Sequence, residues 1–318
     1  MTQPATTSNA PQAEIPDPSG GNSRFVSANG LSFCVETRGD PAGEPVLFIM
    51  GLGAQMTLWP EALLERYAAE GYHVIRFDNR DIGLSSHLKD RLAGHPAAMM
   101  ARSRVGLPVP APYTLRDMAA DAVGVLDAMG VTRAHLVGVS MGGMISQLVA
   151  SLWPERVRSA TLIMTSTNSP RLPMPRPKLI WRLAGIGAKG HDEDSVVARS
   201  LDFWKVIQSP AFPPSEEEVR ARLVRDYRRS YHPAGILRQT RAILASGSLS
   251  SLSRRIRVPT AIIHGTADPL VRPVAAEQLK YLIPHARLEL IDGMGHDLPE
   301  PLLERFVDIS LSAVQSGH

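Results

Sequence analysis

A serine with a glycine two positions away on each side constrains the fold of this chain more than any other stretch. His135–Val139 is a short apolar run, which predicts a strand, and Met141 begins an amphipathic run, which predicts a helix. Gly138 and Gly142 suit a strand-to-helix turn so tight that a Cβ at either position would clash. Such a turn leaves the Ser140 hydroxyl exposed beside a helix N-terminus, whose free N–H groups favour an oxyanion. We therefore predict a nucleophilic serine; the alternative is a chance Gly-x-Ser-x-Gly in a loop.

The composition is that of a globular protein with no nucleic-acid partner. Of the 318 residues, 44% are hydrophobic and 20% are charged, which is enough for a sizeable core. The net charge of +3 is too small to indicate nucleic-acid binding. Cys34 is the single cysteine, which excludes an internal disulfide and a cysteine-based metal cluster. No apolar segment approaches the roughly 20 residues of a membrane span, and no signal-peptide pattern is present. We expect a cytoplasmic protein that does not associate with a membrane.

Strand and helix patterns alternate along most of the chain. Residues 1–22 are rich in Pro, Ser, Thr, Ala and Gly, which predicts a disordered tail. Asn29-Gly30 is a two-residue hairpin signal between the first two strands. The predicted strands cover 24–27, 31–37, 45–50, 72–77, 135–139, 159–164, 260–264 and 287–291. The predicted helices cover 58–70, 115–129, 141–153, 274–282 and a stretch from about 300, whereas 86–112 holds several prolines and is expected to be irregular.

This order predicts an α/β fold with a mostly parallel eight-stranded sheet and helices on both faces. The alternation stops after the sixth strand. Residues 166–250 contain no convincing strand. Their four helical patterns cover 178–188, 193–208, 216–231 and 234–246. We predict a helical cap over 166–250, inserted into a core made of 23–165 and 251–318. The alternative is that these helices merely extend the core.

A base and an acid for Ser140 are expected downstream of it. A serine nucleophile needs a histidine within hydrogen-bond reach and a carboxylate that orients the histidine. Asp268 follows a buried strand in a tight loop, and His296 follows the last strand. Parallel strands place their carboxyl ends at one edge of the sheet, where ligands bind. The other histidines compete poorly, and Asp292 and Asp297 are too close to His296 in sequence to reach its Nδ1 easily.

The remaining site candidates surround the carboxyl ends of the strands. The oxyanion would be bound by the backbone N–H groups of Met141 and of Leu52, since Gly51 and Gly53 let the loop approach the substrate. Asp78 and Arg80 are interpreted as an ion-paired brace of the next turn. The candidates for substrate contact are the loop glycine, an adaptable methionine pair and two tryptophans of the insertion: Gly51, Met99, Met100, Trp181 and Trp204.

The sequence indicates a site that works without a cofactor. It contains no HExxH and no CxxC pattern, and no carboxylates cluster at metal-ligand spacing. Gly51-Leu-Gly53 lacks the third glycine and the acidic partner of a dinucleotide site. We expect neither a metal nor a cofactor.

From about Phe25 to Val307 the chain resembles the α/β-hydrolase superfamily. The resemblance rests on the Gly-Val-Ser-Met-Gly elbow, the turn that begins at Asp78, the Tyr113-Thr-Leu-Arg-Asp-Met lead-in, the His-Gly-Thr-Ala-Asp-Pro-Leu loop and the Gly-Met-Gly-His loop. Within the superfamily it is most similar to carboxylesterases and methylesterases of the aclacinomycin methylesterase type. Two departures affect the pocket: Met50-Gly51 stands where His-Gly is usual, and Arg80-Asp81 stands where Arg-Gly is usual.

The resemblance implies a serine hydrolase that cleaves carboxylic esters of small to medium, largely apolar substrates through an acyl-enzyme. A cofactor-free perhydrolase or a carbon–carbon bond hydrolase with the same triad is the alternative. A non-catalytic ligand-binding module of the same fold is a remoter one, because such modules usually lose triad members. The expected partner is a small-molecule ester, and the protein is expected to be a monomer or a homodimer.

Overall fold

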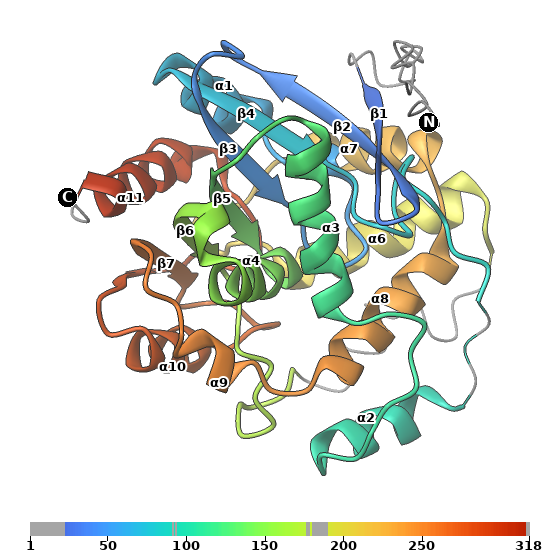
Figure 1. Cartoon of the computed structure of the whole chain (residues 1–318). Coiled ribbons are helices and arrows are strands. Elements are labelled where there is room, and N and C mark those ends of the chain that lie inside the picture. Colours follow the sequence, from blue (N-terminus) through green and yellow to red (C-terminus); the bar gives the residue numbers. More distant parts are fainter. Residues whose placement is uncertain (1–22, 91, 93, 176–178, 180–189, 316–318) are drawn as a thin grey trace, which may run out of the picture.

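The computed structural model describes residues 23–90, 92, 94–175, 179 and 190–315. Within these residues one eight-stranded sheet has the order β1-β2-β4-β3-β5-β6-β7-β8 (Figure 1). Its strands are β1 (Arg24–Ala28), β2 (Leu31–Arg38), β3 (Glu44–Ile49), β4 (Tyr72–Phe77), β5 (Ala134–Val139), β6 (Val157–Ile163), β7 (Thr260–Gly265) and β8 (Arg287–Ile291). Strand β2 runs antiparallel to β1 and β4, and the other neighbours are parallel. The predicted α/β architecture is confirmed.

The hairpin at the start of the sheet follows the predicted turn. Asn29 and Gly30 both have positive φ angles, 51° and 75°. A type I′ turn needs this conformation at both central residues, and Asn-Gly adopts it at low cost. Ala28 pairs directly with Leu31, which sets the register of β1 and β2.

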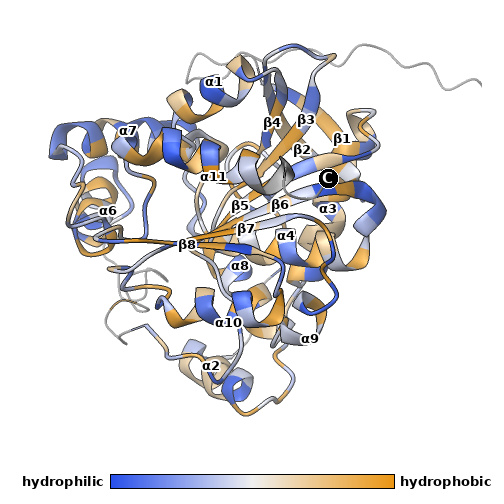
Figure 2. Cartoon of the chain, turned by 90° about the vertical axis from the view of Figure 1, so that its left-hand side faces the viewer, coloured by the Kyte–Doolittle hydropathy of each residue, from blue (hydrophilic) through white to orange (hydrophobic). Residues whose placement is uncertain are grey.

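Helices cover both faces of the sheet because its central strands are apolar on both sides. In β3, Leu47 and Ile49 face one core cluster, whereas Val46 and Phe48 face the other. Figure 2 shows these strands in hydrophobic colours between their helices. Helices α3 (Leu115–Ala128), α4 (Met141–Leu152) and α10 (Val274–Leu282) contribute to the first cluster, and α1 (Glu61–Ala69) and α11 (Leu303–Gln315) contribute to the second.

The described part of the segment between β6 and β7 consists of helices joined by loops. It contains α6 (Glu193–Ile207), α7 (Glu216–Arg229), α8 (Pro233–Ser246) and the short α9 (Ser250–Ser253). The helix starts are encoded locally. Asp192 caps α6 by accepting from the N–H of Ser195 at 2.9 Å, and Ser215 forms a capping box with Glu218 at the start of α7. The predicted helix over 178–188 and the predicted tail over 1–22 lie outside the described residues, Leu179 excepted.

Two helix predictions need correction. The segment 86–112 is not wholly irregular, because it contains α2 (Pro96–Arg104), which packs against α8. The segment holds several prolines, but Pro96 stands at the first helical position, where proline is favoured, and His95 caps the helix. The helix predicted from residue 58 begins only at Glu61, after a 3-10 turn (Met56–Leu58). Among the described helices, none combines the length and the hydropathy that a bilayer-spanning segment requires.

Candidate active site

Ser140 lies at a strained turn between β5 and α4. Its backbone has φ 55° and ψ −117°, a region that non-glycine residues rarely adopt. A Cβ added to Gly138 would lie 2.4 Å from the carbonyl oxygen of Gly142, and one added to Gly142 would lie 1.9 Å from that of Ile49. The backbone therefore has no room for a side chain at either glycine. The Ser140 N–H donates to the carbonyl of Ile163 at 2.9 Å, which fixes the turn against β6.

The structure brings Ser140, His296 and Asp268 together in one hydrogen-bonded chain. The Ser140 Oγ lies 3.1 Å from His296 Nε2, and His296 Nδ1 lies 2.7 Å from Asp268 Oδ2. A carboxylate only accepts hydrogen bonds, so the Nδ1 proton points at Asp268 and Nε2 is left to accept from the serine hydroxyl. The three residues follow β5, β7 and β8, at the carboxyl edge that the sequence indicated.

Asp268 is buried in a setting that keeps it ionised. Burial alone would raise the pKa of its carboxyl group, but the nearby imidazoles of His296 and His264 hold that pKa below its usual value. Its second oxygen accepts from the backbone N–H groups of Leu270 and Val271, both at 2.8 Å. The carboxylate is thus charged, oriented and turned toward His296.

His264 is a neighbour of the acid that the sequence did not single out. This fully buried side chain places Nε2 2.7 Å from the carbonyl oxygen of Val271 and 3.4 Å from Asp268 Oδ2. In the sequence His264 is one of the histidines that compete poorly with His296 as the base, and its contact with Asp268 was not predicted. The signal was its place at the end of β7, four residues before the carboxylate.

The end of α6 holds the loop that carries His296. The His296 N–H donates to the carbonyl of Ile207 at 2.7 Å, and the Gly295 N–H donates to Ser209 Oγ at 2.8 Å. The Ser209 hydroxyl and N–H both donate to Asp297. A Cβ on Gly295 would lie 2.4 Å from the Ile207 carbonyl oxygen, so this close pairing requires glycine. Asp297 therefore binds Ser209, just after α6. The carboxylate that contacts the His296 imidazole is Asp268.

The two predicted oxyanion donors belong to segments beside Ser140. Met141 is the first residue of α4, whose N-terminus carries free N–H groups and a partial positive charge. Leu52 follows Gly51, where an added Cβ would lie 3.2 Å from the Ser140 Cβ. The loop after β3 thus passes directly against the serine.

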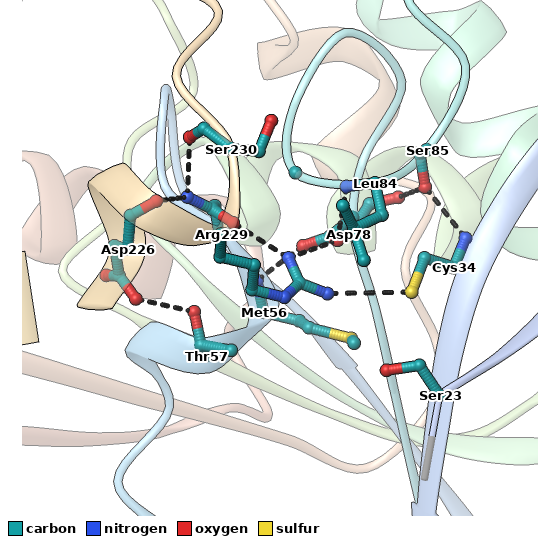
Figure 3. Close-up of polar contacts among 12 residues, drawn as sticks. Ser23, Cys34, Met56, Thr57, Asp78, Leu84, Ser85, Asp226, Arg229 and Ser230 are labelled. Atoms are coloured by element: carbon teal, nitrogen blue, oxygen red, sulfur yellow. Dashed lines mark hydrogen bonds and ion pairs between the residues drawn. The ribbon is translucent and has the colours of Figure 1, made fainter. Parts of the chain in front are cut away.

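Asp78 and Arg80 form buried ion pairs, but with distant helices. Arg229 of α7 lies 2.7 Å from Asp78 Oδ2, and both side chains are fully buried (Figure 3). Burial raises the pKa of Asp78, and Arg229 opposes that rise together with two backbone N–H donors. Arg80 pairs with Asp121 of α3 at 2.6 Å. The brace that the sequence predicted is present, with partners outside the turn.

The candidates for substrate contact are dispersed. Met99 and Met100 lie half-buried on α2, which packs against α8. Trp204 of α6 packs against a cluster of Leu179, Ile207 and Leu270, and the Arg222 guanidinium lies 4.3 Å from its ring centre. Trp181 lies outside the described residues.

Ile236 of α8 covers the loop after β3. A Cβ on Gly53 would lie 3.2 Å from the Ile236 Cγ1. The sequence places Ile236 on an apolar helix face, yet gives no reason to prefer it over the other apolar residues of the insertion.

Comparison with known proteins identifies the family of this fold. Rhodomycin D methylesterase DnrP of Streptomyces peucetius is 28% identical over 301 residues, which cover 88% of this chain and 95% of the relative. Rhodomycin D methylesterase DauP of Streptomyces sp. strain C5 is 28% identical over 302 residues, which again cover 88% of this chain and 95% of the relative. Among solved structures, an esterase of Rhodococcus sp. ECU1013 matches with TM-score 0.68 and 21% identity, covering 93% of this chain and 99% of that one. The model of the alpha/beta hydrolase fold family matches residues 44–300. Since that match spans most of the chain and includes Ser140, Asp268 and His296, the protein belongs to the alpha/beta hydrolase fold family.

Proposed function

We propose that this carboxylic ester hydrolase works through an acyl-enzyme formed on Ser140. The observation that carries the proposal is the continuous hydrogen-bonded chain from Asp268 through His296 to the serine hydroxyl. Ser140 Oγ attacks the ester carbonyl while His296 Nε2 takes its proton, and Asp268 stabilises the imidazolium that forms. His296 then gives the proton to the departing alcohol. A water molecule then attacks the carbonyl of the acyl-enzyme while His296 takes its proton. The proton returns to Ser140 Oγ as the acid is released.

The oxyanion of each tetrahedral intermediate would be bound by the backbone N–H groups of Leu52 and Met141. The position of the loop after β3 against Ser140 and the start of α4 at Met141 support this assignment. A preorganised donor of this kind contributes about 3 kcal/mol to transition-state stabilisation.

The proposed substrates are alkyl esters, with methyl esters first. Two relatives matched over most of their length are named rhodomycin D methylesterases, so a methyl ester of a carboxylic acid is the first substrate to test.

We assign residues 166–250 to a helical cap over a core of 23–165 and 251–318. Its apolar faces, including Trp204 and Ile236, would select the substrate.

Substitution of the nucleophile tests the proposed function. We expect Ser140→Ala to lose more than nine-tenths of wild-type turnover of a methyl ester, since the acyl-enzyme can no longer form. Ser140→Ala and His296→Ala together are expected to cost about as much as either alone, because groups that act as a unit are not additive. Steady-state kinetics checks both. Retention of more than a tenth of turnover by a folded Ser140→Ala protein would contradict the proposal.

A further inference from the structure

The loop after β3 is anchored by a side chain from far along the sequence. The N–H of Gly53 donates to Gln239 Oε1 of α8 at 2.9 Å. The Nε2 of the same amide donates to the carbonyl of Arg80 at 2.8 Å, in the turn after β4. Gln239 is fully buried. One side chain therefore ties the loop beside Ser140 to the neighbouring turn, through two backbone groups.

Both contacts fix the orientation of the Gln239 amide. A backbone N–H can only donate and a backbone carbonyl can only accept, so the amide oxygen must face Gly53 and the nitrogen must face Arg80. No exchange of the two amide atoms satisfies both partners. Loss of either contact would leave a buried polar group unsatisfied.

Other contacts hold the loop on both sides of the glycine. Asn79 Nδ2 donates to the carbonyl of Met50 at 3.0 Å. Farther along, Gln55 Oε1 accepts from Arg229 at 2.8 Å, and the N–H of Met56 donates to Asp78 at 2.8 Å. Figure 3 shows Arg229 reaching from α7 toward Asp78 and Cys34. The loop thus has fixed ends, and the Gln239 contact lies between them.

The contact with Gly53 controls the peptide that follows Leu52. Because a peptide unit is planar, a fixed Gly53 N–H also fixes the Leu52 carbonyl and restricts rotation at the Leu52 Cα. On its other side, Leu52 follows Gly51, which lies against Ser140. We infer that Gln239 is a positioning residue for the oxyanion site: it sets the direction of the Leu52 N–H. This inference rests on the proposed function.

Gln239→Met is the variant that tests the inference. It keeps the length of the side chain and removes both hydrogen-bonding groups. We expect kcat for an alkyl ester to fall about 10- to 100-fold while KM stays within about threefold, since the displaced N–H acts on the transition state and loss of a whole donor costs about 10²–10³. Gln278→Met is the matched control, because Gln278 is a glutamine on α10 that accepts from Thr167. It is expected to keep wild-type kinetics.

An alkyl boronic acid supplies a readout that a purely structural role would not change. Ser140 Oγ bonds to boron and its proton passes to His296, which gives a tetrahedral anionic adduct that needs the oxyanion donors. We expect Gln239→Met to raise the inhibition constant of the boronic acid by about the factor by which kcat falls. Gln239→Glu, when protonated, offers the same acceptor and donor and is expected to bind the inhibitor within about threefold of wild type.

The outcomes separate this inference from the proposed function. Boronic acid binding that is equal in wild type and folded Gln239→Met would overturn the role of Gln239, and so would a loss confined to KM. Wild-type protein that forms no adduct on Ser140 would instead overturn the proposed function. If Gln239→Met yields no folded protein, Gln239→Asn decides by the same two measurements, because its amide is one methylene too short to reach Gly53.

Discussion

At the scale of single residues, Ser140 combines backbone strain with contacts that offset it. A non-glycine residue at φ 55° costs about 1–3 kcal/mol. The Ser140 N–H donates to Ile163, and its carbonyl accepts from Thr165 Oγ1 at 2.6 Å, so both of its backbone polar groups are satisfied. The strain exposes the hydroxyl toward His296. Gly142 is required because α4 packs directly on the backbone of β3, and Gly138 is required because the first turn of α4 packs against it.

The pKa of Asp268 predicts a dependence of stability on pH. The pKa of this carboxyl is lower in the folded state than its usual value of 3.8. The unfolded chain therefore binds the proton more tightly, and stability from the ionised carboxylate is fully present above about pH 4 and is lost as pH falls through the folded pKa. We expect the difference in unfolding free energy between wild type and Asp268→Asn to shrink between pH 6 and pH 3. Urea denaturation at both values measures it, and a difference that grows in acid would contradict this sign.

At the scale of elements, the helices between β6 and β7 have two kinds of contact with the core. Polar contacts hold two loops beside Ser140: Ser209, just after α6, binds the His296 loop, and Gln239 of α8 binds the loop after β3. Apolar contacts are also made, since Ile236 packs over Gly53. We therefore expect polar and apolar substitutions in these helices to have different kinetic effects.

Ile236→Ala tests the apolar role. Its side chain packs over Gly53 in the loop beside Ser140. Under the proposed function its truncation would enlarge the space for the acyl or alcohol group. A methylene in a pocket contributes about 1–3 kcal/mol to discrimination, so we expect the ratio of kcat/KM for longer over shorter esters to change by about tenfold. The reactivity of Ser140 toward a small phosphonate is expected to stay near wild type.

Leu237→Ala is the control for Ile236→Ala. Leu237 is the next residue of α8 and is 38% exposed. We expect it to leave the ester preference unchanged. If Ile236→Ala instead lowers phosphonate reactivity as much as ester turnover, with the fold intact, Ile236 belongs to the catalytic machinery and not to substrate selection.

At the scale of the whole molecule, local patterns predicted the sheet well. The Asn29-Gly30 turn and the apolar run of β3 each depend on neighbours in sequence, and both appear as expected. Helix α2 was missed because Pro96 acts as a helix start, and this became visible only with the cap at His95. The contacts that position the site could not be predicted. Gly53 and Gln239 are 186 residues apart, and no local pattern specifies that two such groups meet.

The proposed mechanism requires ester cleavage to pass through a covalent acyl group on Ser140. Rapid acid quenching of wild-type protein during turnover of an activated ester, followed by peptide mass spectrometry, tests it most directly. We predict an added acyl mass on the peptide that contains Ser140, and none in Ser140→Ala. An acyl group on another residue, or ester turnover with no adduct while deacylation is slow, would rule out this mechanism.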